Sequence, residues 1–273
     1  MINNRYKLLV VDIDGTLLGE NGTISAQDKE AIARVSSAGI IVSLSTGRVL
    51  QACQRIINQL SLDGYHMFSD GALVTNPENS QEVYARPISQ ELVREIAEYT
   101  HEHEINLDFY SPTHYYTDRE TWITDIRRRF FGIEPTITNL GKIWRQERII
   151  KGTLVVSSAG ERTKANAFRH HFRQRLSFSL TRTPAYPDVD FINVLARDVS
   201  KGKALQALTS YLELSPTDTI AIGDGENDLS LLATAGTGIA MGNAHQSLRE
   251  IADYVTLDVE HSGVAAALDK FLL

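Results

Sequence analysis

Two carboxylates stand two residues apart near the start of the chain, in the segment Asp12 to Leu17 (DIDGTL). They follow Leu8 to Val11, a short apolar run with β-branched residues that predicts a buried strand. Ligands of open α/β sheets bind at the carboxyl ends of strands, so both carboxylates would lie at such an edge. Asp12 could attack phosphorus as a nucleophile, and Asp14 could serve as general acid and base. Asp and Gly are also common in ordinary turns after a strand, and for this segment alone that alternative stays open.

Three other groups have residue types that suit the same chemistry. Ser45 to Arg48 (STGR) follows a second predicted strand, and its hydroxyls and glycine amide suit phosphate oxygens, although a plain helix cap is the alternative. Gly223 to Asp228 (GDGEND) adds carboxylates after a late strand, and carboxylate with phosphate oxygens is what Mg²⁺ prefers. An acidic helix start is the alternative there, whereas the spacing of an EF-hand calcium loop is absent. Lys201 begins a helix whose dipole its charge opposes, which a nearby anionic site would explain; Lys203 is a competing candidate.

The elements that would position these groups alternate between strand and helix in the first and last parts of the chain. This alternation predicts a doubly wound, parallel α/β sheet. The middle part is different and indicates an α+β insertion. We therefore expect a core domain at 1–83 and 195–273 and an inserted domain at 84–194. The expected core strands lie at 8–11, 40–44, 66–69, 219–222, 238–241 and 254–256, and the expected core helices at 25–39, 48–60, 200–212, 227–234 and 264–272.

The inserted domain should begin with a helix that Pro87-Ile88-Ser89 opens and that ends near His103. A hairpin is expected from 106–110 and 114–117, followed by strands at 154–156, 177–180 and 189–194 and a helix near 164–175. The three arginines Arg127 to Arg129 read as a solvated helix face.

The composition and net charge of the chain limit the classes of function and partner that it can have. The chain has 273 residues, 42% of them hydrophobic and 22% charged, which is ordinary for a globular protein. Its net charge of -7 argues against nucleic acid or an anionic membrane as partner, and an anionic substrate would need a bound cation. Cys53 is the single cysteine, so no internal disulfide can form, and we read it as a packed thiol. No long apolar segment suggests a signal or a membrane span, and we expect a cytoplasmic enzyme.

Taken together, these motifs resemble those of haloacid dehalogenase (HAD) superfamily hydrolases. The resemblance is to the Cof-type subclass (type IIB), which has a large C2 cap inserted after the third strand. It extends over essentially the whole chain, and it is specific in the core and weak in the cap. The motifs that carry it are Asp12 to Thr16, Ser45 to Arg48, Lys201 and Gly223 to Asp228, with the stretch Gly238 to Ala244 after them.

The resemblance implies a HAD-like core with the strand order 5-4-1-2-3 and a role for each matching residue. Asp12 would be the nucleophile and a Mg²⁺ ligand, and Asp14 the acid/base that also gives the metal its backbone carbonyl. Asp224 would complete the metal ligands, and Lys201 would neutralise Asp12 and phosphate. The implied phosphate-binding residues are Ile13 (through its amide), Thr46, Gly47, Lys201 and Asn227, with Asp228 and Arg48 as possible outer-shell residues.

The function that the resemblance implies is a Mg²⁺-dependent phosphatase. It would hydrolyse phosphate monoesters of small metabolites, such as sugar phosphates, through an aspartyl-phosphate, acting as a monomer or weak homodimer. Asp14 disfavours the dehalogenases, phosphonatases and P-type ATPases of the superfamily, which lack that carboxylate. An intramolecular phosphomutase stays open, as does a receiver-like phospho-acceptor or binding module. The chain departs from the family at Asp70-Gly71, where Asn-Gly is frequent, and at Glu260 to Gly263; both could affect substrate selection.

Overall fold

A computed structural model describes residues 5–183 and 186–273, and their contacts divide the chain into two compact units. The first unit contains the described residues up to Thr46, together with Arg55–Tyr84 and Ser200–Leu273. The second unit contains Gly47–Gln54 and the described residues of Ala85–Val199. The chain therefore passes between the units four times, after Thr46, Gln54, Tyr84 and Val199.

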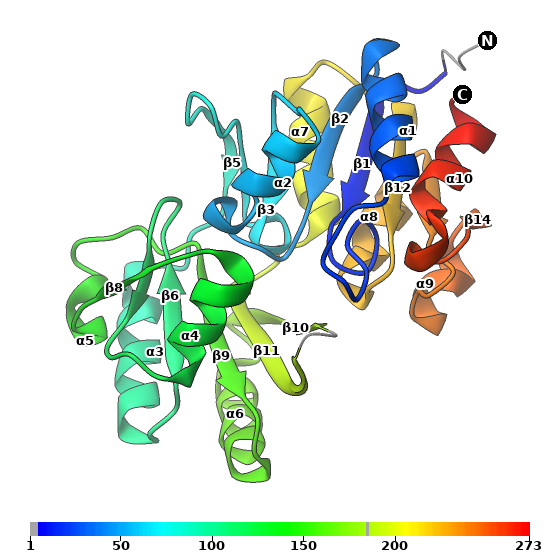
Figure 1. The fold of residues 1–273 in the computed structure, drawn as a ribbon. Helices are drawn as coiled ribbons and strands as arrows, with labels where there is room; N and C mark the ends of the chain where they lie inside the picture. Colours follow the sequence, from blue (N-terminus) through cyan, green and yellow to red (C-terminus); the bar gives the residue numbers. More distant parts are fainter. Residues whose placement is uncertain (1–4, 184–185) are drawn as a thin grey trace. The chain divides into compact units, whose positions relative to one another are not determined.

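The first unit is built on an eight-stranded sheet with the order β14-β13-β12-β1-β2-β3-β4-β5 (Figure 1). Neighbouring strands from β14 to β3 are parallel, whereas β4 is antiparallel to β3. The predicted order of the five core strands is confirmed as β13-β12-β1-β2-β3. The hairpin β4–β5 was not predicted, because strands of three and four residues show no clear alternation. The strands are β1 (Leu8–Asp12), β2 (Ile41–Ser45), β3 (His66–Phe68), β4 (Leu73–Thr75), β5 (Glu82–Ala85), β12 (Thr219–Gly223), β13 (Thr237–Ala240) and β14 (Tyr254–Val255).

Helices cover both faces of this sheet, as a doubly wound fold requires. Helix α1 packs against α10, and α7 packs against α8. The chain moves outward in one direction from β1 to β3 and in the other from β12 to β14, so right-handed crossovers place α1 and α7 on opposite faces (Figure 1). The helices are α1 (Ala26–Ser37), α2 (Gln54–Gln59), α7 (Lys201–Tyr211), α8 (Leu229–Thr234), α9 (Gln246–Ile251) and α10 (Gly263–Phe271), with 3₁₀ turns at Leu50–Ala52, Ser69–Gly71, Pro216–Asp218, Glu226–Asp228 and Val259–His261.

Two helices of this unit begin at the predicted serine caps, and one predicted helix is not continuous. Ser25 accepts a hydrogen bond from the Asp28 amide at 3.0 Å and begins α1. Ser200 likewise begins α7. The continuous helix expected at 48–60 is wrong, because Val49 is extended and only a 3₁₀ turn precedes α2. Val49 instead packs into a small apolar cluster of the second unit, and this packing overrides local helix preference.

Asp28 joins α1 to the start of α10, which leads to a test of stability. Its buried carboxylate accepts a hydrogen bond from the Ala265 amide at 2.7 Å and one from the Ser25 hydroxyl at 2.8 Å. Asp28→Ala would leave that amide buried without an acceptor, so we expect the free energy of unfolding to fall by about 2 kcal/mol. Urea denaturation measures the change. Asp269→Ala is the matched control, because Asp269 joins the same two helices through an exposed ion pair with Arg34. A loss of equal size in the control would contradict this account, since exposed pairs contribute less than about 1 kcal/mol.

The second unit is built on a six-stranded sheet with the order β10-β11-β9-β6-β7-β8. The predicted hairpin, now β6 and β7, and the predicted helix after Ser89, now α3, are both present. The short elements β8, α4 and α5 were not predicted. The elements are α3 (Gln90–Glu102), β6 (Leu107–Tyr110), β7 (Tyr115–Thr117), α4 (Trp122–Ile126), a π-helical turn (Arg127–Phe131), β8 (Pro135–Ile137), α5 (Leu140–Ile143), β9 (Lys151–Val156), α6 (Ala159–Phe172), β10 (Leu176–Thr183) and β11 (Tyr186–Ala196).

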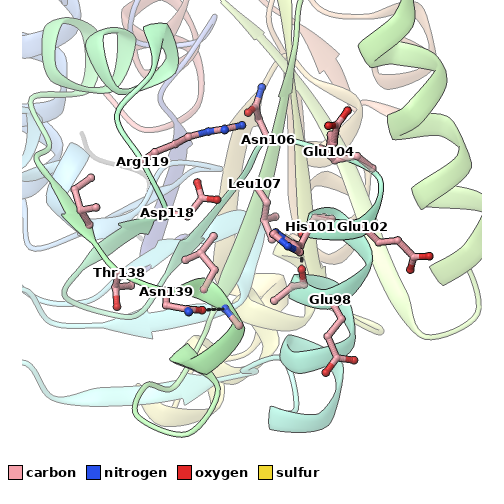
Figure 2. Close-up of a pocket in the computed structure, with 16 residues that line it drawn as sticks. Glu98, His101, Glu102, Glu104, Asn106, Leu107, Asp118, Arg119, Thr138 and Asn139 are labelled. Carbon is pink, nitrogen blue, oxygen red and sulfur yellow. Dashed lines mark hydrogen bonds between the residues drawn. The ribbon is translucent and has the colours of Figure 1, made fainter.

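A surface groove of about 1360 Å³ lies at one end of this unit, between the carboxyl end of α3 and the amino end of α5 (Figure 2). Its acidic side chains include Glu98, Glu102 and Asp118, with Arg119 beside them. None of the predicted site residues lines it.

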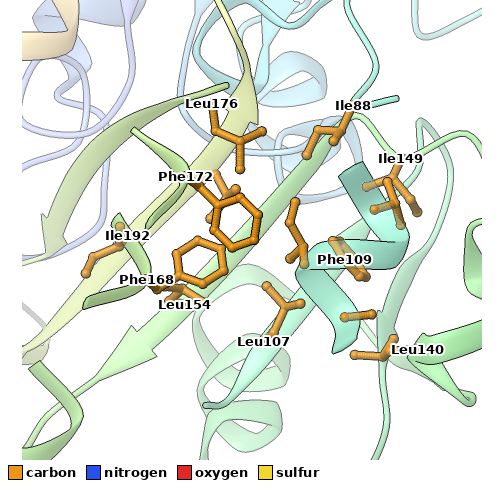
Figure 3. Close-up of a cluster of buried hydrophobic side chains, with 14 of the residues drawn as sticks. Ile88, Leu107, Phe109, Leu140, Ile149, Leu154, Phe168, Phe172, Leu176 and Ile192 are labelled. Atoms are coloured by element: carbon orange, nitrogen blue, oxygen red, sulfur yellow. The ribbon is translucent and has the colours of Figure 1, made fainter. Parts of the chain in front are cut away.

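The core of the second unit lies on one face of its sheet. Helices α3, α5 and α6 pack there over alternate residues of the strands, such as Leu107 and Phe109 of β6 (Figure 3). The rings of Phe168 and Phe172 of α6 contact each other within this cluster at a tilt of 44°, with centroids 4.7 Å apart. A three-helix layer over one sheet face is the α+β arrangement expected for the insertion.

The opposite face of this sheet carries a buried ion pair that corrects one prediction. Arg127 is only 6% exposed, lies 3.3 Å from Asp108 and faces the rings of Phe131 and Phe191. The predicted solvated face is therefore wrong for Arg127, because a guanidinium that stacks on rings and pairs with a carboxylate can be buried. Arg128 does lie nearer the surface, where it pairs with acidic side chains.

Candidate active site

Three parallel strands bring the predicted motifs to one edge of the first unit's sheet. Asp12 ends β1 directly beside Ser45, the last residue of β2. On the other side of β1, Val11 is in register with Ile222 of β12, so Asp224 follows at the same edge. Thr46 is buried just beyond β2. The carboxyl ends of neighbouring parallel strands thus position side chains that are 34 to 212 residues apart in sequence.

Lys201 joins these segments from the first turn of α7. Its side chain is fully buried, and its ammonium lies 2.6 Å from Asp12 Oδ1 and 2.6 Å from Asp228 Oδ1. It also donates to the Ser45 carbonyl at 3.2 Å. Burial lowers the pKa of Lys201, but Asp12 and Asp228 raise it more, so the net shift is upward and the ammonium stays charged. Lys203, the competing candidate, is exposed.

Asp228 has no carboxylate oxygen without a partner. Oδ1 binds Lys201, and Oδ2 accepts hydrogen bonds from the amides of Asp224 and Gly225 at 3.1 and 3.0 Å. These contacts hold the turn after β12 and orient Lys201. The geometry agrees with an orienting role for Asp228.

Asp224 faces the turn after β1. The Thr16 hydroxyl donates to Asp224 Oδ1 at 3.0 Å. Gly15 has a φ of +85°, and a Cβ there would collide with the Asp224 carboxylate, so this turn requires glycine. Asp14 is half-buried and lies close enough to Asp224 to raise its pKa.

The carboxylates of this site titrate unusually. Burial raises the pKa of Asp12 well above its ordinary value, Lys201 lowers it, and Asp228 and Asp224 raise it further. Burial raises the pKa of Asp224 most, and the negative charge of Asp228 raises it further, to about 7. These shifts come first from burial of the carboxylates and then from their mutual repulsion, and Lys201 offsets them only in part.

The same residues could hold a divalent cation. Asp12, Asp224 and Asp228 each offer a carboxylate oxygen within 4.8 Å of the others. Because Lys201 and two amides already occupy Asp228, Asp12 and Asp224 are the better candidates as ligands. Hard oxygen donors fit Mg²⁺, whose positive charge would offset both the burial of these carboxylates and the repulsion from Asp228, the two main causes of the raised pKa of Asp224.

A buried turn after β3 contacts several of these segments, and sequence reasoning did not include it among the site residues. The Asp70 amide donates to the Thr46 carbonyl at 3.0 Å, and the Asp70 carboxylate accepts from Asn227 Nδ2 at 2.9 Å. Its only signal in the sequence is an Asp-Gly pair after a predicted strand. Thr16 was also missed as a partner of Asp224.

Two predicted residues belong to the second unit. The Gly47 carbonyl accepts a hydrogen bond from Lys151 Nζ at 2.7 Å, and the Arg48 guanidinium lies 5.2 Å from the centre of the Phe131 ring. Gly47 nevertheless follows Thr46 directly in the chain. Ile13 is buried in the turn after β1, and its carbonyl accepts bonds from the amides of Leu17 and Leu18.

Comparison with known proteins agrees with this architecture. The profile of the haloacid dehalogenase-like hydrolase family matches residues 9–268. The chain is 25% identical to the Bacillus subtilis (strain 168) 5-amino-6-(5-phospho-D-ribitylamino)uracil phosphatase YcsE, over 98% of this chain and 96% of that protein. A haloacid dehalogenase-like hydrolase from Bacteroides thetaiotaomicron shares its fold with a TM-score of 0.84 at 24% identity, over 97% and 99% of the two chains. The HAD subclass IIB sugar phosphatase BT4131 does so with a TM-score of 0.76 at 22% identity, over 97% and 98%.

The fold and the family match define the class: a HAD-like α/β hydrolase with an inserted cap. The chain belongs to the haloacid dehalogenase-like hydrolase family. The predicted fold class and the Cof-type resemblance are thereby confirmed. Among the described residues, no helix is both long and apolar enough to cross a membrane.

Proposed function

We propose that this protein is a Mg²⁺-dependent phosphatase that hydrolyses phosphate monoesters of small metabolites through an aspartyl-phosphate on Asp12. Phosphatase is also the enzyme class of its family relatives. The observation that carries the proposal is the fully buried Lys201, 2.6 Å from Asp12 Oδ1, at a strand edge that Asp224 shares. A buried cation held against a carboxylate at that edge suits an anionic reaction centre.

Asp12 would act as the nucleophile. Lys201 donates a hydrogen bond to Asp12 Oδ1 and would reduce the repulsion between this carboxylate and the phosphate. In the first step a bond forms between a carboxylate oxygen of Asp12 and phosphorus, and the bond from phosphorus to the ester oxygen breaks. Asp14 would give its proton to that leaving oxygen. In the second step Asp14 takes a proton from water, whose oxygen attacks phosphorus and releases Asp12 and phosphate.

The remaining residues would hold the transferred group. The donors to phosphoryl oxygens would be the Ile13 amide, Thr46, Gly47, Asn227 and Lys201. The positive charge of Lys201 would bind these oxygens more strongly as negative charge develops on them. Arg48 would lie outside the set of residues that contact the phosphoryl group. When bound by Asp12, Asp224 and the Asp14 carbonyl, Mg²⁺ would supply positive charge that lets an anionic ester approach carboxylates.

Substrate class and cellular setting are part of the same proposal. YcsE acts on a phosphorylated ribityl compound and BT4131 is described as a sugar phosphatase, which favours a sugar phosphate or similar metabolite here. We propose that 84–194 forms the domain that selects the substrate and 1–83 with 195–273 the catalytic core. The net charge of -7 supports the absence of a nucleic-acid or membrane partner, and we propose a cytoplasmic monomer or weak homodimer.

A screen of phosphorylated metabolites with Mg²⁺ tests the function, and metal removal tests the cofactor. We expect turnover of at least one ester at or above ~1 per second, an ordinary enzymatic rate. EDTA should lower kcat at least about 100-fold and excess Mg²⁺ should restore it, because two carboxylates would otherwise repel the substrate. Activity that persists in EDTA would contradict the metal assignment. An isomeric phosphorylated product without free phosphate would indicate a phosphomutase, and stable phosphorylation without turnover a receiver-like module.

A further inference from the structure

The turn Ser69–Gly71 is buried and has an unusual backbone. Ser69, Asp70 and Gly71 have φ values of +53°, +54° and +91°. Left-handed conformations cost free energy for residues with a side chain, of order 1 kcal/mol each, and persist where surrounding contacts enforce them. All three residues are buried, so the turn is held by its neighbours rather than by solvent.

Each residue that encloses this turn comes from a different segment of the candidate site. The Asp70 amide donates to the Thr46 carbonyl at 3.0 Å. A Cβ on Gly71 would collide with the Ser200 carbonyl, next to Lys201. The Asp70 carboxylate accepts from Asn227 Nδ2 at 2.9 Å. The turn therefore contacts the segments after β2 and β12 and the start of α7.

The contact between Asp70 and Asn227 determines the orientation of the Asn227 side-chain amide. An ionised carboxylate only accepts hydrogen bonds, so Asp70 selects the NH₂ end of the amide. The Asn227 oxygen is then turned to the side of Gly225. One N–H binds Asp70, and the second N–H is a donor that an anionic ligand can accept.

We propose that Asp70 is a positioning residue that holds the Asn227 amide with its second N–H directed at the bound phosphoryl group. The inference rests on the proposed function and names a residue which that function does not use. Asn227 would bind phosphate oxygens equally in substrate, product and transition state. Loss of its orientation should therefore weaken phosphate binding and raise KM with little change in kcat.

The test compares four Mg²⁺-loaded full-length variants with the wild type. Asp70→Gly removes the acceptor and accommodates the positive φ, so the turn is kept. Asp70→Asn keeps one acceptor but can pair with Asn227 either way round. Asn227→Ala removes the donor, and the fourth variant combines it with Asp70→Gly. The measurements are KM, kcat and the inhibition constant of inorganic phosphate.

We expect Asp70→Gly to raise KM and the phosphate inhibition constant about tenfold, with kcat within about twofold. Asn227→Ala should raise KM and the phosphate inhibition constant by a similar factor. The double variant should raise them no further than either single variant, because both substitutions remove the same interaction. Asp70→Asn should cost at most about threefold. Ser80→Gly is the control, since Ser80 also has a positive φ in the first unit but is exposed.

Two results would overturn the inference while leaving the proposed function intact. One is an unchanged phosphate inhibition constant in Asp70→Gly. The other is a double variant whose effect is the product of the two single effects, which is how independent sites behave. A wild-type chain that hydrolyses no phosphate ester would instead overturn the proposed function itself, and the inference with it.

Discussion

Asp12→Asn should lower kcat at least about 10⁴-fold, the scale seen when a nucleophile is removed from a catalytic unit. The amide is nearly the same size as the carboxylate, and its oxygen can still accept the hydrogen bond from Lys201. What it loses is the negative oxygen that attacks phosphorus. Turnover of the best ester from the substrate screen measures the loss, and acid quenching with mass spectrometry shows whether the phosphorylated chain forms.

The control for this substitution is Asp63→Asn, which changes an exposed aspartate of the same unit. Its kcat should stay within about twofold of the wild type. Circular dichroism and thermal melting of Asp12→Asn should show a folded chain, so that loss of activity reports on chemistry. A variant that is folded and retains a tenth of wild-type kcat would refute Asp12 as nucleophile.

Lys201→Met should damage both activity and stability. Methionine keeps the length of the side chain but leaves Asp12 and Asp228 buried without their shared cation. Removing one member of a buried charge cluster typically costs about 3 kcal/mol, and we expect that loss in the free energy of unfolding at pH 8. The lost charge at the reaction centre should also lower kcat about 10³-fold. Lys203→Met is the matched control, because that lysine is exposed on the same helix.

The stability loss in Lys201→Met should depend on pH in a definite direction. In the wild type the pKa of Lys201 is raised, so its contribution is complete below its ordinary value of 10.5 and is lost only above it. Burial already raises the pKa of Asp12, and without Lys201 this pKa rises further. A carboxyl with a raised pKa in the folded state stabilises it at low pH and ceases to as the pH rises through that pKa.

The deficit of Lys201→Met relative to the wild type should therefore be smaller at pH 5 than at pH 8. Urea unfolding in EDTA measures it without the complication of a bound cation. An equal deficit at both pH values would mean that Asp12 does not take up a proton when the lysine is missing. Lys203→Met should show no deficit at either pH.

The sequence predicted those parts of the structure that depend on strong local patterns. The apolar strand before Asp12 and the serine caps before α1 and α7 are examples, because period and cap chemistry are visible in a few residues. The placement of Asp12 near Asp224 follows from which strands end beside each other, whereas Lys201 reaches them from the first turn of α7. The family resemblance supplied the strand order, which the single chain could not.

What the sequence missed depends on tertiary contacts. Arg127 looked like part of a charged surface run, yet Asp108 and three aromatic rings bury it. Asp70 stood out in the sequence only as a departure from the family's frequent Asn-Gly, and nothing local indicated its contact with Asn227, 157 positions away. The extended backbone at Val49 likewise reflects packing within the second unit rather than a local preference. Such tertiary interactions produce no periodic pattern in the sequence.

Because the chain passes between the two units four times, exchanging the second unit between relatives to change substrate specificity requires more than one segment. Val49 and Ala52 pack with Tyr110 and Tyr115, and Gln51 Nε2 donates to the Pro112 carbonyl at 2.9 Å. A chimaera that exchanges only 85–199 would set a foreign surface against the resident Gly47–Gln54 segment. Grafts that bring both segments from the same donor should fold, whereas single-segment grafts should express poorly. A graft of the second unit therefore needs two pieces of chain, one of them only eight residues long.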